Sequence, residues 1–186
     1  MLGDSRSGKV VLVSHCLLNQ NSIVRGLARH RAMVRELVEL LDELGLGVVQ
    51  LPCPEMLYCG LRRWWVSREQ YDNPGFRRLC RRLSKLVADY LVEYRRNNID
   101  VVGLIGVTGS PSCGVYTTST GWLGGNPRDA NPLRRTSGRG VFMEILLNVL
   151  EKHGVKPRIL LEYDYDDPEN SFKTIRGVLE KSLTNR

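Results

Sequence analysis

The sequence predicts an α/β fold, a single Rossmann-like three-layer domain with a mainly parallel sheet of about four to five strands. Short apolar runs rich in β-branched residues alternate with longer segments of helical periodicity. A chain of 186 residues is most simply one domain, here residues 1–186. Hydrophobic residues make up 42% and charged residues 25%, as in ordinary globular proteins. This composition excludes collagen-like, mucin-like and wholly disordered chains.

The first half of the chain is expected to supply two strands and one helix. Residues 9–14 (KVVLVS) are apolar and β-branched, as in a buried strand. A polar turn follows, and apolar residues then recur at helical spacing over residues 27–44. A second short strand is predicted over residues 48–51. Pro52 and Pro54 should end it and force an irregular turn.

The second half repeats the alternation around one long loop. A helix should begin at Asn73-Pro74 and run to about Arg96, because proline is favoured in a first helical turn. Residues 100–107 (DVVGLIGV) form the most apolar predicted strand, and the Gly-, Ser- and Thr-rich residues 108–140 are expected to be an active-site loop region. We then expect a helix over residues 141–153, a strand over residues 158–162, and a helix from Asp167-Pro168 to about Leu183.

The N-terminal residues, the lengths of the apolar runs and the net charge indicate the location of the protein and its possible ligands. Residues 1–8 are polar, could be flexible and lack the apolar centre of a signal peptide. No apolar run reaches the roughly 18 residues of a membrane span, so we expect a cytoplasmic protein without a membrane partner. The net charge is +7, and between residues 61 and 98 ten basic residues face four acidic ones. This stretch could attract a phosphorylated substrate or RNA, or could simply be a solvated helix face. Trp64-Trp65 could likewise stack a base or cover a core edge.

Three of the five cysteines follow predicted strands directly. Cys16 follows the first strand, Cys53 the second, and Cys113 lies just beyond the third. The carboxyl ends of parallel strands share one edge of the sheet, where ligands bind. If the first strand lies between the other two, the three thiols should converge. Cys59 could lie near them, whereas Cys80 is expected to pack in a helix.

Converging cysteines have several uses. They could hold an iron–sulfur cluster with one open iron, or zinc with a fourth ligand. One could be a nucleophile, or all three could be small buried residues. The chain contains no CxxC pair, so neither a ferredoxin nor a zinc-ribbon pattern supports a metal. His15 adjoins Cys16, but neighbouring side chains of a strand point to opposite faces.

Polar residues beside the cysteines are candidates for catalysis. Glu55 follows Cys53 by two residues and could be a general acid or base, or else a surface acid or helix cap. Ser110 and Ser112 offer hydroxyl groups, although serine is also common in turns. Gly114 allows a close backbone approach. Together with Ser14 and Asn19, which flank Cys16, we expect Ser112 and Gly114 to contact substrate.

Three segments in this order resemble the DUF523 family, whose best-understood members are thiouracil desulfurases. The segments are VSHCLLNQNS, LPCPE and SPSCG, each after a predicted strand, and GRGVFMEILLNVLEKHGV is similar to the C-terminal part of the family. The resemblance implies a [4Fe-4S] cluster held by Cys16, Cys53 and Cys113, with one iron left open for sulfur. It also places the family's acidic residue at Glu55 and its serine at Ser110, for proton transfer and substrate orientation.

The resemblance therefore predicts an enzyme that removes sulfur from a thiolated pyrimidine without redox change and releases sulfide. The chain departs from the family pattern after Cys16, after Glu55 and in the loop with Trp122 and PRDANPLRR. These basic and aromatic segments would suit a thiolated nucleotide or tRNA as well as a free base. The alternatives are a zinc- or ligand-binding protein without catalysis, and a transferase or hydrolase with a cysteine nucleophile at Cys113.

Overall fold

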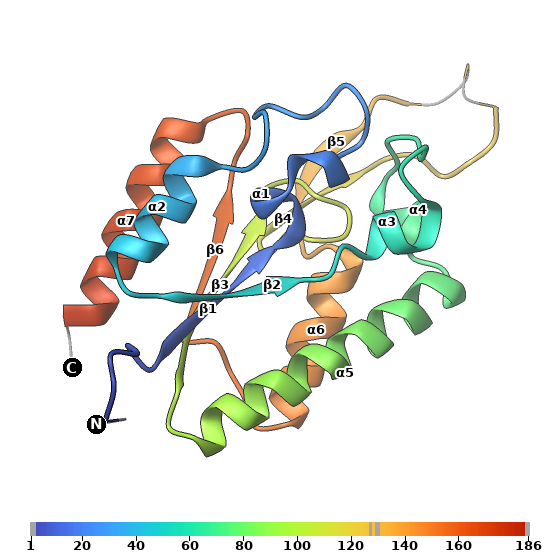
Figure 1. Ribbon diagram of the computed structural model, residues 1–186. Helices are drawn as coiled ribbons and strands as arrows, with labels where there is room; N and C mark the ends of the chain where they lie inside the picture. The colour runs from blue at the N-terminus through green and yellow to red at the C-terminus, as the bar shows by residue number, and fades with distance from the viewer. Residues whose placement is uncertain (1–2, 127, 129–130, 185–186) are drawn as a thin grey trace.

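Four parallel strands form the central sheet in the order β2-β1-β3-β6 (Figure 1). The computed structural model describes residues 3–126, 128 and 131–184. The strands are β1 (Lys9–Ser14), β2 (Gly47–Leu51), β3 (Asp100–Val107) and β6 (Ile159–Tyr163). This arrangement confirms the predicted α/β class with a mainly parallel sheet. The first strand does lie between the second and third, which was the condition for the cysteines to converge.

Helices cover both faces of the sheet and make the three layers. Two helices, α5 (Pro74–Arg96) and α6 (Val141–Lys152), pack on one face around the buried Phe76, Leu104 and Phe142. The other face carries α2 (Arg35–Glu43) and α7 (Pro168–Thr184), which enclose a second core. Figure 1 shows α2 and α7 on one side of the sheet and α5 and α6 on the other. The apolar faces of these helices follow the 3.6-residue period of the sequence.

The predicted helix over residues 27–44 was wrong at its beginning, because α2 starts only at Arg35. The preceding segment is held in a non-helical path by Gln20. The side-chain oxygen of Gln20 accepts the backbone N–H groups of Arg29 and His30, each at 3.2 Å. The backbone N–H of Gln20 donates to the carbonyl of Ala32 at 2.7 Å. The contact with Gln20 thus occupies the Ala32 carbonyl, which a helix over residues 27–44 would use for its own i to i+4 hydrogen bond.

Short elements replace what were predicted to be irregular turns. After β1 come α1 (His15–Leu18) and a 3-10 turn (Gln20–Ser22). The turn after β2 is α3 (Pro54–Cys59), followed by α4 (Arg68–Tyr71). Proline at the first position of α3 is compatible with a helix, so Pro54 begins this element as well as ending the previous one.

The long loop after β3 contains a hairpin. Its strands, β4 (Thr117–Thr120) and β5 (Arg134–Ser137), pair antiparallel beside the carboxyl ends of the main sheet. Glu162 fixes the start of this hairpin, because its Oε1 accepts the N–H groups of Tyr116 at 2.7 Å and Thr117 at 3.1 Å. Within the described parts of the chain, no helix is long and apolar enough to cross a membrane.

Candidate active site

The three predicted cysteines lie at the carboxyl ends of three neighbouring strands. Cys16 is in α1 after β1, Cys53 caps the beginning of α3 after β2, and Cys113 lies in the loop after β3. All three line one cavity of about 250 Å³ that opens to the surface. This volume is a little below the range of most ligand sites, so the cavity suits a small ligand.

The loop that carries Cys113 is fixed by the beginning of α6. The backbone N–H of Val141 binds the carbonyl of Pro111, and that of Met143 binds the carbonyl of Ser112, both at 3.0 Å. Gly140 makes this approach possible, since a Cβ there would lie 2.5 Å from the Ser112 carbonyl oxygen. The carbonyl groups of the loop thus satisfy N–H groups that a helix beginning leaves unpaired, and they hold the cysteine in place.

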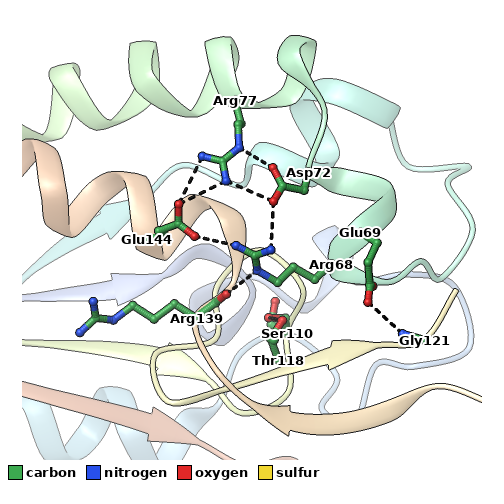
Figure 2. Close-up of polar contacts among 9 residues, drawn as sticks. All are labelled: Arg68, Glu69, Asp72, Arg77, Ser110, Thr118, Gly121, Arg139 and Glu144. Carbon is green, nitrogen blue, oxygen red and sulfur yellow. Dashed lines mark hydrogen bonds and ion pairs between the residues drawn. The ribbon is translucent and has the colours of Figure 1, made fainter. Parts of the chain in front are cut away.

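A partly buried charge network supports this arrangement (Figure 2). Arg68 donates to Glu144 at 2.6 Å and to Asp72 at 3.0 Å, and Arg77 also contacts both acids. Arg68 binds the carbonyl of Arg139 as well, at 2.9 Å, directly before Gly140. The network therefore joins α4, α5 and α6 at the point where the Cys113 loop is anchored.

Glu55 faces the cavity and binds the loop of the third cysteine. The hydroxyl of Ser112 donates to Glu55 Oε1 at 2.6 Å. Ser110 lies behind, with its Oγ 3.4 Å from that of Ser112, and accepts the N–H of Cys113 at 3.0 Å. The structure thus brings Glu55, Ser110 and Ser112 together at the cavity, and the serine in direct contact with Glu55 is Ser112.

Arg63 is a site residue that the sequence analysis missed. Its Nε donates to Glu55 Oε2 at 3.1 Å, and its side chain is only 4% exposed. A second nitrogen binds the Ser22 carbonyl at 2.6 Å. Arg63 therefore orients the carboxylate of Glu55 and ties it to the segment after α1. Its position in the LRRWW segment gave no signal of this role, because charged runs are usually solvated.

The thiols of the site are close enough to repel each other once charged. Burial raises the pKa of Cys16 to about 12, and the charges of Cys53 and Glu55 add to the effect. Burial and the charges of Cys16 and Cys53 raise the pKa of Cys113 well above its usual value. A nucleophilic cysteine needs the opposite shift, so these values give no support to the cysteine-nucleophile alternative.

The three thiols at the cavity are donors of the type that an iron–sulfur cluster would take. Thiols that repel one another when charged need a cation to become thiolates together, and coordination to a metal deprotonates a thiol. In the residues that the structure describes, no group of three or more His, Cys, Asp or Glu side chains is placed to hold a metal ion. That result concerns a single metal ion, whereas a cluster would carry each thiolate on a separate iron. The remaining cysteines lie elsewhere, with Cys59 exposed at the end of α3 and Cys80 buried in the core.

The other three residues predicted to contact substrate, Ser14, Asn19 and Gly114, do not line the cavity. Ser14 is fully buried at the end of β1, and its hydroxyl has no hydrogen-bond partner in the described structure. Asn19 caps the 3-10 turn by accepting the N–H of Asn21 at 3.1 Å. Gly114 is needed for packing, because a Cβ there would lie 1.9 Å from the Thr117 carbonyl oxygen. None of these three is among the residues that line the cavity.

Residues beyond the predicted set complete the wall. β1 ends at Ser14, so His15 begins α1 and lines the cavity beside Cys16. Tyr165 does so from the segment after β6, and its hydroxyl accepts from the Gln20 amide at 2.7 Å. The same amide binds the Cys16 carbonyl at 2.8 Å. Gln20 thus connects Cys16 with the opposite wall, a role that only the tertiary structure reveals. Apolar lining comes from Ile23, Val24, Leu27, Trp65 and Val66.

Comparison with known proteins agrees with this geometry. The family model described as "Putative 2-thiouracil desulfurase" matches residues 8–135, a range that contains the three cavity cysteines and Glu55. A protein of Methanocaldococcus jannaschii, described as uncharacterized protein MJ0003, is 31% identical over 175 residues. The match covers 94% of this chain and 97% of that protein. No solved structure matches this chain.

Proposed function

The chain belongs to the 2-thiouracil desulfurase family, and on that basis we propose that it is an iron–sulfur-dependent enzyme that removes sulfur from a thiolated pyrimidine. The substrate is a thiouracil-like base, nucleotide or thiolated tRNA, and the reaction is hydrolytic. A C=S group and water become a C=O group and hydrogen sulfide, with no net oxidation or reduction. The supporting observation is that three cysteines and one carboxylate, from the ends of three adjacent strands, line the same cavity.

Cys16, Cys53 and Cys113 are the proposed cluster ligands. When bound, the [4Fe-4S] cluster supplies one iron without a protein ligand, which acts as a Lewis acid and sulfur acceptor. The chain contributes the three thiolates and the rigid placement of each. Burial and the charge of Glu55 raise the pKa of Cys53, and the backbone N–H of Met56, which donates to its sulfur at 3.4 Å, acts in the opposite direction.

Glu55 is the proposed proton-transfer residue. Water must lose protons as its oxygen replaces sulfur at carbon, and a carboxylate facing the cavity can accept one. Arg63 and Ser112 hold the two oxygens of Glu55 from different directions, so the carboxylate keeps one orientation. Ser110 fixes both Ser112 and the N–H of Cys113, which couples the carboxylate to the third ligand.

The test measures cofactor content and activity separately. Wild-type protein, purified or reconstituted without oxygen, should contain about four irons and four acid-labile sulfides. Cys16→Ala, Cys53→Ala and Cys113→Ala should each lose them, whereas Cys59→Ala, a matched exposed control, should keep them. Glu55→Gln should retain the iron and release sulfide from 2- or 4-thiouracil roughly 10²- to 10⁴-fold more slowly.

Other outcomes would favour other functions. Wild-type protein that stays free of iron after reconstitution, with one zinc per chain, would support the zinc-binding alternative. Full iron in any of the three cysteine variants would remove that residue from the ligand set. We also propose a cytoplasmic location, because reducing conditions preserve the five free cysteines.

A further inference from the structure

The mouth of the cavity lies between two chain segments whose exposed residues take no part in the proposed chemistry. One is the loop between the 3-10 turn and α2, which contributes Leu27 and Arg29 to the wall. The other follows α3 and contributes Trp65 and Val66. A ligand that extends out of the cavity must pass these segments, so their surface chemistry indicates what it is.

Both segments carry arginines without acidic partners. Arg25, Arg29 and Arg31 on the loop and Arg62 after α3 are exposed. Over the described part of the chain, none of the four takes part in an ion pair. Arg135, which also lines the cavity, binds Asp164 at 2.8 Å and Asp166 at 2.9 Å instead. The four unpaired charges therefore create a positive potential along both segments, and Arg29 brings it to the cavity wall.

The segment after α3 also presents exposed aromatic rings. Trp64 is 85% exposed and Trp65 is 47% exposed. Trp65 is supported edge-on by Trp122 of the hairpin, with ring centroids 6.2 Å apart, whereas Trp64 leaves its ring open to solvent. A large exposed tryptophan beside unpaired arginines is the combination that binds unstacked bases and their phosphates.

The two sides of the rim are held in a fixed relation. The oxygen of Gln20 accepts the N–H groups of Arg29 and His30, which fixes the arginine loop. Arg63 binds the Ser22 carbonyl at 2.6 Å, so the segment after α3 is attached to the beginning of that loop. A preformed surface of this kind costs little ordering on binding.

We propose that this rim, Arg25, Arg29, Arg31, Arg62, Trp64 and Trp65, binds a single-stranded polynucleotide and presents one of its bases to the cavity. The arginines contact phosphates on either side of that base, and a neighbouring base stacks on Trp64. The inference rests on the proposed function for the identity of the presented base, a thiolated pyrimidine. RNA and single-stranded DNA share this chemistry, and the experiment includes both.

Binding of unthiolated 12-nucleotide fluorescent oligouridylate and oligodeoxythymidylate to the reconstituted full-length protein provides the first test. Four phosphate contacts on a single strand should give a slope of about −2.8 for the logarithm of the association constant against that of salt concentration. The triple variant Arg25→Gln, Arg31→Gln, Arg62→Gln should reduce the slope to about −0.7. Trp64→Ala should weaken binding roughly 5- to 150-fold.

A matched control uses arginines of α5, which lie outside the rim. Arg78→Gln, Arg81→Gln and Arg82→Gln together remove the same charge from exposed positions and should leave the slope near −2.8. Wild-type binding without salt dependence would overturn the proposal. So would an equal loss in the α5 variant, or unchanged binding in Trp64→Ala and the arginine variant.

Sulfide release separates this proposal from the proposed function. The rim variants should act on free thiouracil like the wild type, and should act more slowly on a 4-thiouridine-containing oligonucleotide. Slower reaction of both substrates would overturn the rim assignment. If the wild type releases sulfide from neither substrate, the proposed function fails, and the binding of the unthiolated oligonucleotides still decides whether the rim is a polynucleotide site.

Discussion

Arg63→Met is expected to destabilise the protein strongly, although residue 63 lies within a basic surface segment. The substitution keeps most of the aliphatic stem and removes the guanidinium. It leaves the Glu55 carboxylate without its ionic partner, in a pair whose side chains are only 4% and 13% exposed. It also leaves the carbonyl groups of Ser22 and Gly60 without the donors at 2.6 and 3.3 Å.

The separation of the charges sets the size of the effect. At 3.1 Å and an effective dielectric constant of 20, the attraction is about 5 kcal/mol before desolvation is subtracted. Removing one partner of a buried pair costs about 3–5 kcal/mol, because the other charge stays buried. In a chain of this length that corresponds to a fall in Tm of roughly 6–20 °C.

Urea denaturation of the iron-free protein, followed by circular dichroism, measures the loss. Arg35→Met is the matched control, because Arg35 and Glu39 form an ion pair at 2.7 Å with both side chains exposed, and its loss should be below about 1 kcal/mol. Glu55→Gln completes a double-mutant cycle. The double variant contains no unpaired buried charge, so it should recover at least 1 kcal/mol relative to the sum of the single losses.

The reasoning would be refuted if Arg63→Met were no more destabilising than Arg35→Met. Strict additivity in the cycle would also refute it, because two side chains in direct ionic contact must be coupled.

Three further predictions concern the scaffold and the thiols. Gly114→Ala places a Cβ 1.9 Å from a backbone oxygen and should abolish iron binding. The control Gly177→Ala places a Cβ with no atom within 4 Å and should stabilise α7 by up to about 1 kcal/mol, as measured by urea denaturation. Glu162→Gln weakens the acceptor of the hairpin N–H groups and should cost about 1.5–3 kcal/mol in the same assay, and a loss below 0.5 kcal/mol would contradict it. The pKa of Cys16 is about 12 in the folded protein and exceeds its unfolded value, so the iron-free protein should lose stability as the pH rises from about 9 towards 12. Cys16→Ser should flatten this pH dependence of stability. An identical pH profile in the variant would contradict the prediction.

The sequence was sufficient to predict the parallel sheet and the convergence of three cysteines at one edge of it. Apolar β-branched runs identify buried strands, and the rule that parallel strands end at one edge places Cys16, Cys53 and Cys113 together. The order β2-β1-β3 was needed for that conclusion, and the structure has it. These features were predictable because they follow from periodicity and topology, which are properties of whole segments.

The remaining features depend on single tertiary contacts. The segment before α2 has helical periodicity, yet hydrogen bonds to the side chain of Gln20 hold the backbone of this segment in a non-helical conformation. The strands of the hairpin consist of Thr, Ser and Arg, without the apolar alternation that indicates a strand. The ion pair of Arg63 with Glu55 spans eight residues and depends on how the chain turns after α3, so no local pattern could have shown it.

The position of each cysteine at the end of a separate strand also determines when the proposed cluster could form during biosynthesis. Residues 16, 53 and 113 meet only after the crossovers through α2 and α5 have placed β2 and β3 beside β1. Short metal-binding loops can fold around their metal, but here no segment shorter than about half of the chain contains all three thiols. Delivery of the proposed cluster would therefore follow folding, and its donor would recognise a finished domain rather than a nascent peptide.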